Sequence, residues 1–471
     1  MKEILAGLAP ERVFHYFEAI SAIPRGSGNT AAVSDYCREF AEAHGLEARQ
    51  DSWHNILIKK PASPGYETHP AVILQGHLDM VCEKDPDCAH DFLKDGLELF
   101  TEGDWIGARG TTLGGDDGIA VAMGLAILED QTLSHPPLEV LFTTDEETGM
   151  YGAAGLDPAW ITGRTLLNLD SEAEGILTVS CAGGARCELT LPLEGRRFQG
   201  RMKRVTVTGL QGGHSGAEIN KGRLNANVVM ANFLMTLPSF RLASIAGGLK
   251  DNAIPRASEA VIASDADLPA LAREFVQKTK VPGDPGLEIL VEDAPPAASA
   301  FTPEDSRKAV RFLSSLPSGV QAMSSEIEGL VETSLNLGIL TSSDDGLLAS
   351  FSVRSSVNRS KDILLETLTS IAGDFGGKAS THGHYPAWEY VKESRLRRVM
   401  VETWKKTTGK EPVVEAIHAG LECGLFSAKL PGLDAVSIGP DMRDIHTSRE
   451  RLSISSSRRT YEYVLAVLAA L

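Results

Sequence analysis

The sequence lacks three features that would each indicate a different class of protein. Its six cysteines show no C-x-x-C spacing, which favours reduced thiols in a cytoplasmic protein over a disulfide framework. No apolar run approaches the ~18 residues of a membrane span. The formal net charge is −18 and no Lys/Arg cluster is evident, which argues against nucleic acid as a partner. We therefore expect a cytoplasmic protein with neither a nucleic-acid nor a membrane partner.

The acidity and the N-terminal segment have ordinary explanations. Most surface carboxylates only keep a protein soluble, so net charge by itself does not predict a metal site. Glu3, Glu11 and Arg12 interrupt what would be the apolar core of a signal peptide, so we expect a helix of the mature protein there. A chain of 471 residues is too long for one ordinary core and predicts two or three domains.

Four apolar runs predict an α/β fold with a largely parallel sheet. Strands that are buried on both faces are apolar along their whole length, as parallel strands covered by helices are. A further segment, 117–130, is apolar at helical spacing and predicts a crossover helix. The runs lie at 71–75, 138–144, 165–169 and 434–439.

The middle of the chain has a different pattern. RRFQGRMKRVTVTGL and LLASFSVRSSVN alternate apolar and polar residues, as half-exposed antiparallel strands do. Segments 280–286 and 292–305 are rich in Pro, Gly or Ala and are expected to be loops. We predict a parallel-sheet domain of residues 1–185 and 385–471 and an inserted α+β domain of residues 186–384. The Pro/Ala-rich stretch suggests two subdomains in the insertion.

Chemically reactive side chains follow the predicted parallel strands. His77 and Asp79 follow the first, Glu146 and Glu147 the second and Asp170 the third. The last run is followed by His446, and Asp116 with Asp117 precedes the crossover helix. Ligands of open α/β sheets gather beyond the carboxyl ends of the strands, so these groups are expected at one edge.

The residue types favour a divalent metal site. Imidazole and carboxylate without thiolate suit Zn²⁺, Co²⁺ or Mn²⁺. His77 and Asp79 point to the same side of an extended segment, so one can bind metal while the other orients it. Glu146 and Glu147 are adjacent, so one can bind metal while the other faces an attacking water.

Each motif also has a structural explanation when taken alone. A single His-x-Asp or Glu-Glu pair is commonly structural or solvated. Asp117 is expected to cap the crossover helix, and His446 would be an ordinary loop histidine. The convergence of independent acids and histidines after successive strands is what favours a metal centre. A serine-nucleophile elbow and a phosphate-binding loop are excluded, because GGHSG and LGGDDG lack the required residues.

These residues resemble the co-catalytic zinc aminoacylase/carnosinase family, most closely its Xaa-His (aminoacyl-histidine or β-alanyl-histidine) dipeptidase branch. The similarity covers nearly the whole chain, and the motifs appear in family order. They are AIPRGSGN, LQGHLDMV, TTLGGDDGIA, PLEVLFTTDEETGMYGAAGL, LNLDSEAEG, GGHSGAEI, DNAIPR, SLNLG, IHAGLECGLF and VSIGP.

The resemblance implies a zinc-aminopeptidase-like catalytic domain with two divalent cations, zinc above all. Asp116 would bridge both cations. His77 and Asp170 would complete one site, and Glu147 and His446 the other. Two further carboxylates have supporting roles: Asp79 would hold His77, and Glu146 would be the general base.

The resemblance also assigns roles in the inserted domain, which would close over the substrate as a lid. His214 would steady the tetrahedral oxyanion, and Asn252, Arg354 and Gly420 would bind the substrate. A surface ion pair is the alternative for Arg354. Around the last ligand the sequence is IHTSRERLSI, where many relatives have His-Ser-Pro, which leaves the ligand His446 intact.

The expected function is hydrolysis of small unblocked dipeptides, of Xaa-His type such as carnosine. The alternatives are an N-acyl-amino-acid deacylase or tripeptidase with the same metals, and a non-catalytic peptide-binding protein on a peptidase scaffold. A binding protein does not need the base Glu146, which argues against the last. The sequence leaves open a homodimer, and with it whether His214 acts in its own chain.

Overall fold

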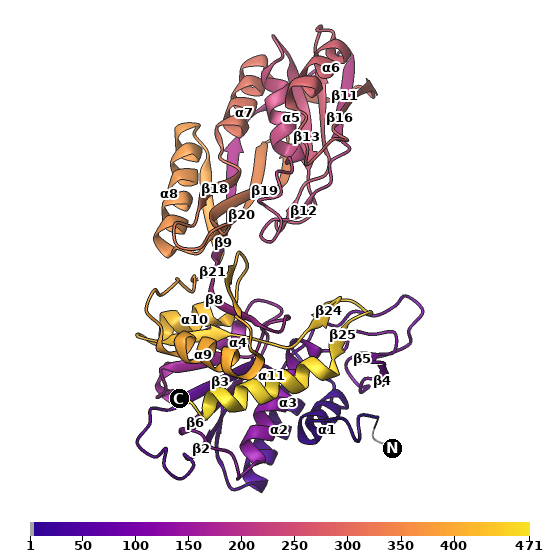
Figure 1. Ribbon diagram of the computed structural model, residues 1–471. Coiled ribbons are helices and arrows are strands. Elements are labelled where there is room, and N and C mark those ends of the chain that lie inside the picture. The colour runs from indigo at the N-terminus through magenta and orange to yellow at the C-terminus, as the bar shows by residue number, and fades with distance from the viewer. Residues whose placement is uncertain (1–3) are drawn as a thin grey trace. The chain divides into compact units, whose positions relative to one another are not determined.

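The computed structural model describes residues 4–471, which form two compact units (Figure 1). Unit 1 comprises the described residues up to Val179, with Tyr390–Ala416 and Leu421–Leu471. Unit 2 comprises Ser180–Glu389 and Ile417–Gly420. The predicted insertion, 186–384, lies within unit 2, and the inclusion of Ile417–Gly420 in this unit was not predicted.

Unit 1 is built on an eight-stranded sheet in the order β1-β2-β6-β3-β7-β23-β8-β22. The four apolar runs form its centre and pair in parallel. They are β3 (Val72–His77), β6 (Leu138–Thr143), β7 (Thr165–Asn168) and β23 (Asp434–Ser437). Antiparallel strands flank this centre, so the sheet is mixed. They are β1 (Glu47–Gln50), β2 (Ile56–Lys60) and β8 (Ile176–Cys181), and β22 (Val413–Ile417) lies at the edge beyond β8.

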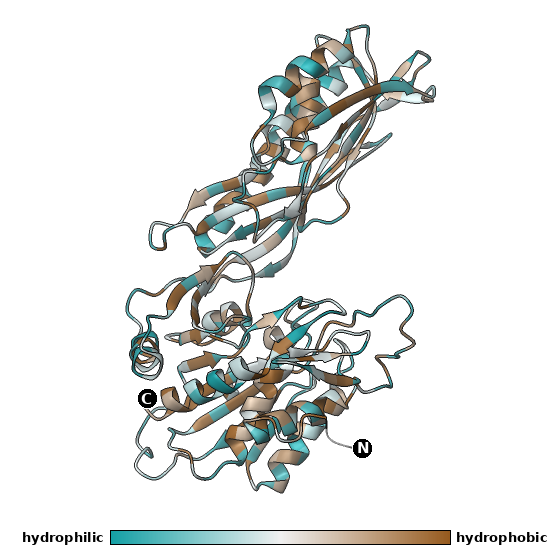
Figure 2. Cartoon of the chain, turned by 45° about the vertical axis from the view of Figure 1, so that its right-hand side comes forward, coloured by the Kyte–Doolittle hydropathy of each residue, from teal (hydrophilic) through white to brown (hydrophobic). Residues whose placement is uncertain are grey.

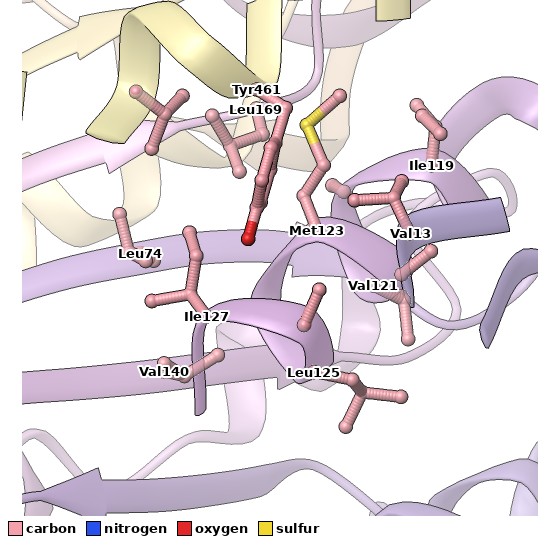
Figure 3. Close-up of a cluster of buried hydrophobic side chains, with 14 of the residues drawn as sticks. Val13, Leu74, Ile119, Val121, Met123, Leu125, Ile127, Val140, Leu169 and Tyr461 are labelled. Carbon is pink, nitrogen blue, oxygen red and sulfur yellow. The ribbon is translucent and has the colours of Figure 1, made fainter. Parts of the chain in front are cut away.

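The predicted crossover helix is α3 (Gly115–Glu129), which is apolar on all sides and almost wholly buried. It packs against α1 (Glu11–Ser21) and β3, and Figure 3 shows its side chains in the core with Leu74, Val140 and Tyr461. Each fully buried Leu or Ile contributes about 1.5–3 kcal/mol relative to exposure. This packing fixes α3 on the sheet, and Asp116 lies at its N-terminal end.

Further elements cover the sheet or extend it. A four-stranded sheet, β24-β25-β5-β4, holds the connection that carries His446. Its strands are β4 (Leu99–Glu102), β5 (Trp105–Ala108), β24 (Met442–Arg443) and β25 (Arg451–Ser453). The remaining α-helices of unit 1 are α2 (Ala31–Ala43), α4 (Tyr151–Gly155), α9 (Arg395–Thr408), α10 (Glu422–Lys429) and α11 (Ile454–Leu468).

Unit 2 is built on one nine-stranded antiparallel sheet with its own hydrophobic cluster. The predicted alternation is present in β11 (Met202–Thr208) and β20 (Gly346–Ser355). The other strands are β9 (Gly183–Pro192), β13 (Arg241–Gly247), β15 (Ser258–Ala263), β16 (Glu288–Ala294), β18 (Gly319–Met323), β19 (Val331–Ser343) and β21 (Lys378–Tyr385). The sheet is continuous from β16 to β21, so it joins the two suggested subdomains.

Four helices and two short strand pairs complete unit 2. In Figure 2 several helices of both units carry hydrophobic residues beside hydrophilic ones, as amphipathic helices do. The helices are α5 (Ala226–Met235), α6 (Leu268–Thr279), α7 (Pro303–Ser315) and α8 (Asn358–Asp374). The strand pairs are β10 (Gly195–Arg197) with β17 (Ser299–Phe301), and β12 (Gly213–His214) with β14 (Ala253–Ile254).

The prediction of a loop at 292–305 was wrong. This segment contains the end of β16, all of β17 and the start of α7. The Thr302 side chain caps α7 by accepting the Asp305 N–H, and Pro303 occupies the first turn. Thr-Pro-Glu-Asp is a helix-start signal, and the Pro/Ala content of the segment concealed it.

Two further observations bear on the predictions made from composition. None of the six cysteines forms a disulfide bond with another described residue. Among the residues that the structure describes, no helix combines the length and the apolar character needed to cross a membrane.

Candidate metal centre

Ligand atoms from five separate segments converge in unit 1. His77 ends β3, Glu147 lies in the turn after β6, and Asp170 follows β7. Asp116 lies at the start of α3, and His446 lies between β24 and β25. They form two groups, His77–Asp116–Asp170 and Asp116–Glu147–His446, each with its ligand atoms within 4.8 Å of one another. The resemblance implied the same two sets.

Asp116 belongs to both groups and offers one oxygen to each. Its Oδ1 lies 3.2 Å from Nε2 of His77, and its Oδ2 lies 3.2 Å from Nε2 of His446. Glu147 Oε1 is 3.0 Å from the same His446 nitrogen, and Asp170 Oδ1 is 3.9 Å from His77 Nε2. A carboxylate in this position can bridge two cations, with an imidazole and a further carboxylate for each.

Asp79 holds both the His77 ring and the turn after β6. Its carboxylate accepts hydrogen bonds from the backbone N–H groups of Glu146 (3.1 Å) and Glu147 (3.3 Å) and from the Ser27 hydroxyl (2.8 Å). Its backbone oxygen is 3.1 Å, and its Oδ1 3.4 Å, from His77 Nδ1. Because Nδ1 is engaged, Nε2 is the nitrogen directed at Asp116. The sequence predicted the contact with His77 but not the support of the turn.

Two residues at this centre have left-handed backbone conformations. Asp145, next to Glu146, has φ 56°, and His446 has φ 60°. Such a conformation costs about 1–3 kcal/mol in a residue with a side chain, and it persists where surrounding contacts enforce it. Asp145 has such a contact, because its Oδ1 accepts the Gly28 N–H at 2.6 Å. Strain of this kind commonly accompanies functional sites.

Burial and mutual repulsion shift the pKa values of the centre. Burial, reinforced by the charges of Glu422 and Glu147, raises the pKa of Glu146 to about 8. Hydrogen bonds to Asp116 and Glu147 raise the pKa of His446 to about 10. Of these two groups only His446 belongs to the candidate ligands, and a proton on its Nε2 competes with a cation for the same lone pair.

The prediction that Asp117 caps the crossover helix was wrong. The residue before α3 is Gly114, and the helix has no side-chain cap. Asp117 is fully buried and its Oδ2 accepts the backbone N–H of His77 at 3.1 Å. Asp117 therefore ties the start of α3 to the end of β3, and the bond that joins it to Asp116 is a cis peptide.

In unit 2, His214 is held as a neutral ring. Its Nδ1 accepts hydrogen bonds from the backbone N–H groups of Gly216 (3.2 Å) and Ala217 (3.1 Å). Burial, and then the positive charge of Arg354, lower its pKa. A neutral imidazole that accepts at Nδ1 carries its proton on Nε2. His214 can therefore donate a hydrogen bond from Nε2.

The positive charge of Arg354 also acts on a second histidine of unit 2, His418. Nη1 of Arg354 donates to the Tyr385 hydroxyl at 3.1 Å, and its buried Nε has no hydrogen-bond partner among the described residues. His418 is buried, contacts the Ser334 hydroxyl at 2.7 Å, and has its pKa lowered to about 4 by burial and by Arg354. The sequence did not assign His418 a role, because nothing in the motif IHAGLECG distinguishes it from a structural histidine.

The segment Ile417–Gly420 packs against the turn that carries His214. A Cβ atom on Gly216 would lie 2.6 Å from the His418 carbonyl oxygen and 3.1 Å from the His214 ring, so only glycine allows this approach. The other candidate of this region, Asn252, is exposed and accepts the Ser215 N–H through its backbone oxygen at 2.9 Å. Unit 2 thus brings its four predicted site residues into neighbouring segments.

The ligand set of unit 1 fits divalent cations. It consists of two imidazoles and three carboxylates, the ligands of Zn²⁺ and similar ions, and the charged partners of Asp116 are the two histidines. Carboxylates gathered in a buried site need compensating positive charge. A shared carboxylate between two such groups, beyond the ends of parallel strands, is typical of metal-dependent hydrolases.

The chain belongs to the peptidase family M20/M25/M40, whose model matches residues 73–470. It is 37% identical to the cytosol non-specific dipeptidase of Escherichia coli over an alignment of 464 residues, and the match covers 96% of this chain and 96% of that one. These matches confirm the predicted family and its metal-dependent hydrolase class.

Solved structures confirm the predicted fold class. The aminoacylhistidine dipeptidase of Vibrio alginolyticus superimposes with a TM-score of 0.93 at 35% identity, covering 99% of this chain and 98% of that one. The aminopeptidase PepT of Bacillus cereus, at 16% identity, gives a TM-score of 0.58 over 98% of this chain and 99% of that one. Human carnosine dipeptidase 1, at 12% identity, gives 0.51 over 97% and 95%. The last two show the fold alone.

The raised pKa of His446 predicts how the metal-free protein responds to pH. The ordinary value is 6.5 and the folded value about 10, so the folded state binds an extra proton between them. The stabilisation is complete below pH 6.5 and is lost as the pH rises towards 10. Urea unfolding of chelator-treated wild type and His446→Gln should show a stability difference that shrinks from pH 6 to pH 10. A difference independent of pH would contradict this assignment.

Proposed function

We propose that this protein is a dinuclear metal-dependent dipeptidase that hydrolyses small unblocked dipeptides, including the Xaa-His type exemplified by carnosine. The main support for the proposal is the position of Asp116. Its Oδ1 lies 3.2 Å from Nε2 of His77, and its Oδ2 lies 3.2 Å from Nε2 of His446. The names of two relatives that match nearly the whole chain, a non-specific dipeptidase and an aminoacylhistidine dipeptidase, support the substrate class.

We propose two bound cations, with zinc as the preferred metal and cobalt or manganese as substitutes. His77, Asp116 and Asp170 would hold one, and Asp116, Glu147 and His446 the other. The nitrogen and oxygen ligands suit these metals, and the absence of thiolate from the set argues against a structural zinc site. When bound, such a cation pair polarises the scissile carbonyl and makes a shared water more acidic.

We propose Glu146 as the general base and acid. It would take a proton from the attacking water and deliver it to the leaving amine. Burial of its carboxyl group favours proton uptake, as the raised pKa of about 8 indicates. Asp79 would act as a positioning residue, since its carboxylate holds the Glu146 backbone and lies against the His77 ring.

We propose that unit 1 is the catalytic domain and unit 2 the lid. His214 would donate its Nε2–H to the tetrahedral oxyanion, which the acceptor role of its Nδ1 supports. Arg354 would bind the terminal carboxylate of the substrate through its planar fork. Asn252 and the backbone of Gly420 would make further substrate contacts.

We also propose a cytoplasmic location, with a small peptide as substrate and with neither nucleic acid nor membrane as partner. The scattered spacing of the six cysteines and the name of the cytosolic relative support the location. The formal net charge of −18 argues against nucleic acid.

Replacing Glu146 by Gln tests the catalytic role. Gln keeps the shape but cannot accept a proton, so kcat should fall about 10²–10⁴-fold while both cations stay bound. Dipeptide turnover and elemental analysis of the same preparation measure both quantities.

A suitable control is Glu174→Gln, which changes a carboxylate that is paired with Arg459 in the same unit. This variant should keep nearly full turnover. Undiminished turnover by Glu146→Gln with full metal content would remove Glu146 from the base role. A wild-type protein that binds peptide without cleaving it would favour the binding-protein alternative.

A substrate panel separates the dipeptidase from its near alternatives. We expect hydrolysis of carnosine, Ala-His and Gly-Leu, and little hydrolysis of tripeptides or N-acetyl amino acids, because the proposed site binds a free dipeptide. Relative kcat/KM values across the panel measure this. Preferred cleavage of N-acetyl amino acids or tripeptides would identify a deacylase or a tripeptidase instead.

A further inference from the structure

Two buried charged side chains, Arg25 and Glu450, hold the turn that presents Asp116. The turn consists of residues 113–116 and contains Gly114 and Gly115. Arg25 and Glu450 are each 2% exposed. Neither belongs to the two groups of candidate ligands.

Glu450 binds the turn through four backbone N–H groups. Its Oε2 accepts from Leu113 (2.7 Å) and Gly114 (3.0 Å), and its Oε1 accepts from Gly115 (2.8 Å) and Asp116 (3.3 Å). Successive N–H groups that point to one side form a concave anion site. Here the anion is a side chain of the same protein, four residues after His446 along the chain.

Arg25 binds the same turn and also the segment after β3. Its Nη2 donates to the carbonyl oxygen of Gly114, and its Nη1 donates to those of Leu78 (2.9 Å) and Asp79 (3.2 Å). Gly114 has φ 63°, and a Cβ atom there would lie 2.5 Å from Arg25 Nη2. The turn therefore requires glycine at this position, both for its conformation and for the approach of the guanidinium.

These contacts connect the three segments that carry His77, Asp116 and His446. Arg25 joins the first to the second, and Glu450 joins the second to the third. Buried charged groups are costly unless every lone pair and proton is engaged, and apolar packing could stabilise a turn as well. Arg25 and Glu450 both bind the turn that carries Asp116. A requirement for accurate placement of this turn explains two buried charges there better than a contribution to the stability of the fold does.

We propose that Arg25 and Glu450 are positioning residues that fix the Asp116 carboxylate midway between two cation sites, so that it can bind both. This inference rests on the proposed dinuclear site and adds residues to it that touch neither metal nor substrate. Loss of either contact leaves Asp116 free to tilt towards one histidine. The cation on the other side then loses a ligand.

The test is a titration of metal-free protein with Co²⁺, followed by visible absorption and calorimetry. Glu450→Gln keeps the shape of the side chain. Its NH₂ group, however, is a hydrogen-bond donor, and it would face two backbone N–H groups that donate to a carboxylate oxygen in the wild type. We expect at least one of the two Co²⁺ sites to bind about 10–100-fold more weakly, as is usual when support for a metal ligand is lost. Arg25→Lys keeps the charge but loses the planar guanidinium group with its two Nη donors, so it should weaken Co²⁺ binding at the same site.

Glu139→Gln is the matched control. Glu139 is also 2% exposed and accepts backbone N–H groups, from Thr162 and Gly163, but it lies at the start of β6, away from the turn after that strand. Both Glu→Gln variants should lower the free energy of unfolding, and only Glu450→Gln should weaken Co²⁺ binding. Should Glu450→Gln fail to fold, Arg25→Lys decides the question by the same titration.

Three results would overturn the proposal. Wild-type Co²⁺ affinities in Glu450→Gln, or in Arg25→Lys if only that variant folds, would show that the contacts are merely structural. Equal weakening in Glu139→Gln would show that loss of stability is the cause. A wild-type chain that binds fewer than two Co²⁺ ions would instead contradict the proposed dinuclear function, on which the role of the two residues rests.

Discussion

Mutual repulsion among buried carboxylates is the constraint on which this structure depends. Asp116, Glu147 and Asp170 are brought within a few ångströms of two imidazoles, and their ligand atoms in each group lie within 4.8 Å. Like charges at such distances destabilise one another unless protons or cations compensate them. Burial, with the charges of Glu422 and Glu147 added, raises the pKa of Glu146, and hydrogen bonds to Asp116 and Glu147 raise the pKa of His446, so both groups retain protons that an isolated side chain would release. Divalent cations would supply the same compensation.

The fold of unit 1 provides rigid support for this arrangement. The parallel strands deliver ligands from β3, β6 and β7 to one edge, and the buried helix α3 holds Asp116 in place. Hydrogen bonds to backbone groups provide much of the remaining support for the ligands. Asp79 accepts hydrogen bonds from two N–H groups of the turn after β6, and Glu450 accepts hydrogen bonds from four N–H groups at the start of α3. Side chains that bind the ligand-bearing turns in this way orient the ligands.

Much of this could be predicted from the sequence, because the informative signals were local. The four apolar runs form the parallel centre of the sheet, and the residues that follow them supply the candidate ligands. The antiparallel edges could not be predicted, since short half-exposed strands such as β1 carry little periodicity. The helix start at Thr302 was overlooked, although its cap signal is present.

Interactions between segments that are distant in the chain could not be predicted from the sequence. Glu450 contacts a turn more than three hundred residues earlier in the chain, and nothing in RERLSI marks it as different from a surface acid. Arg25 and the second role of Asp79 are similar cases. The role of Asp117 was misjudged for a related reason, because an aspartate near a helix start usually caps the helix, whereas this one binds the His77 backbone.

Anomalous diffraction from zinc-loaded crystals would locate the cations around Asp116 independently of activity. Two peaks are expected, one on each side of the Asp116 carboxylate, with His77 and Asp170 around one and Glu147 and His446 around the other. A single peak, or two peaks that do not share Asp116, would contradict this prediction.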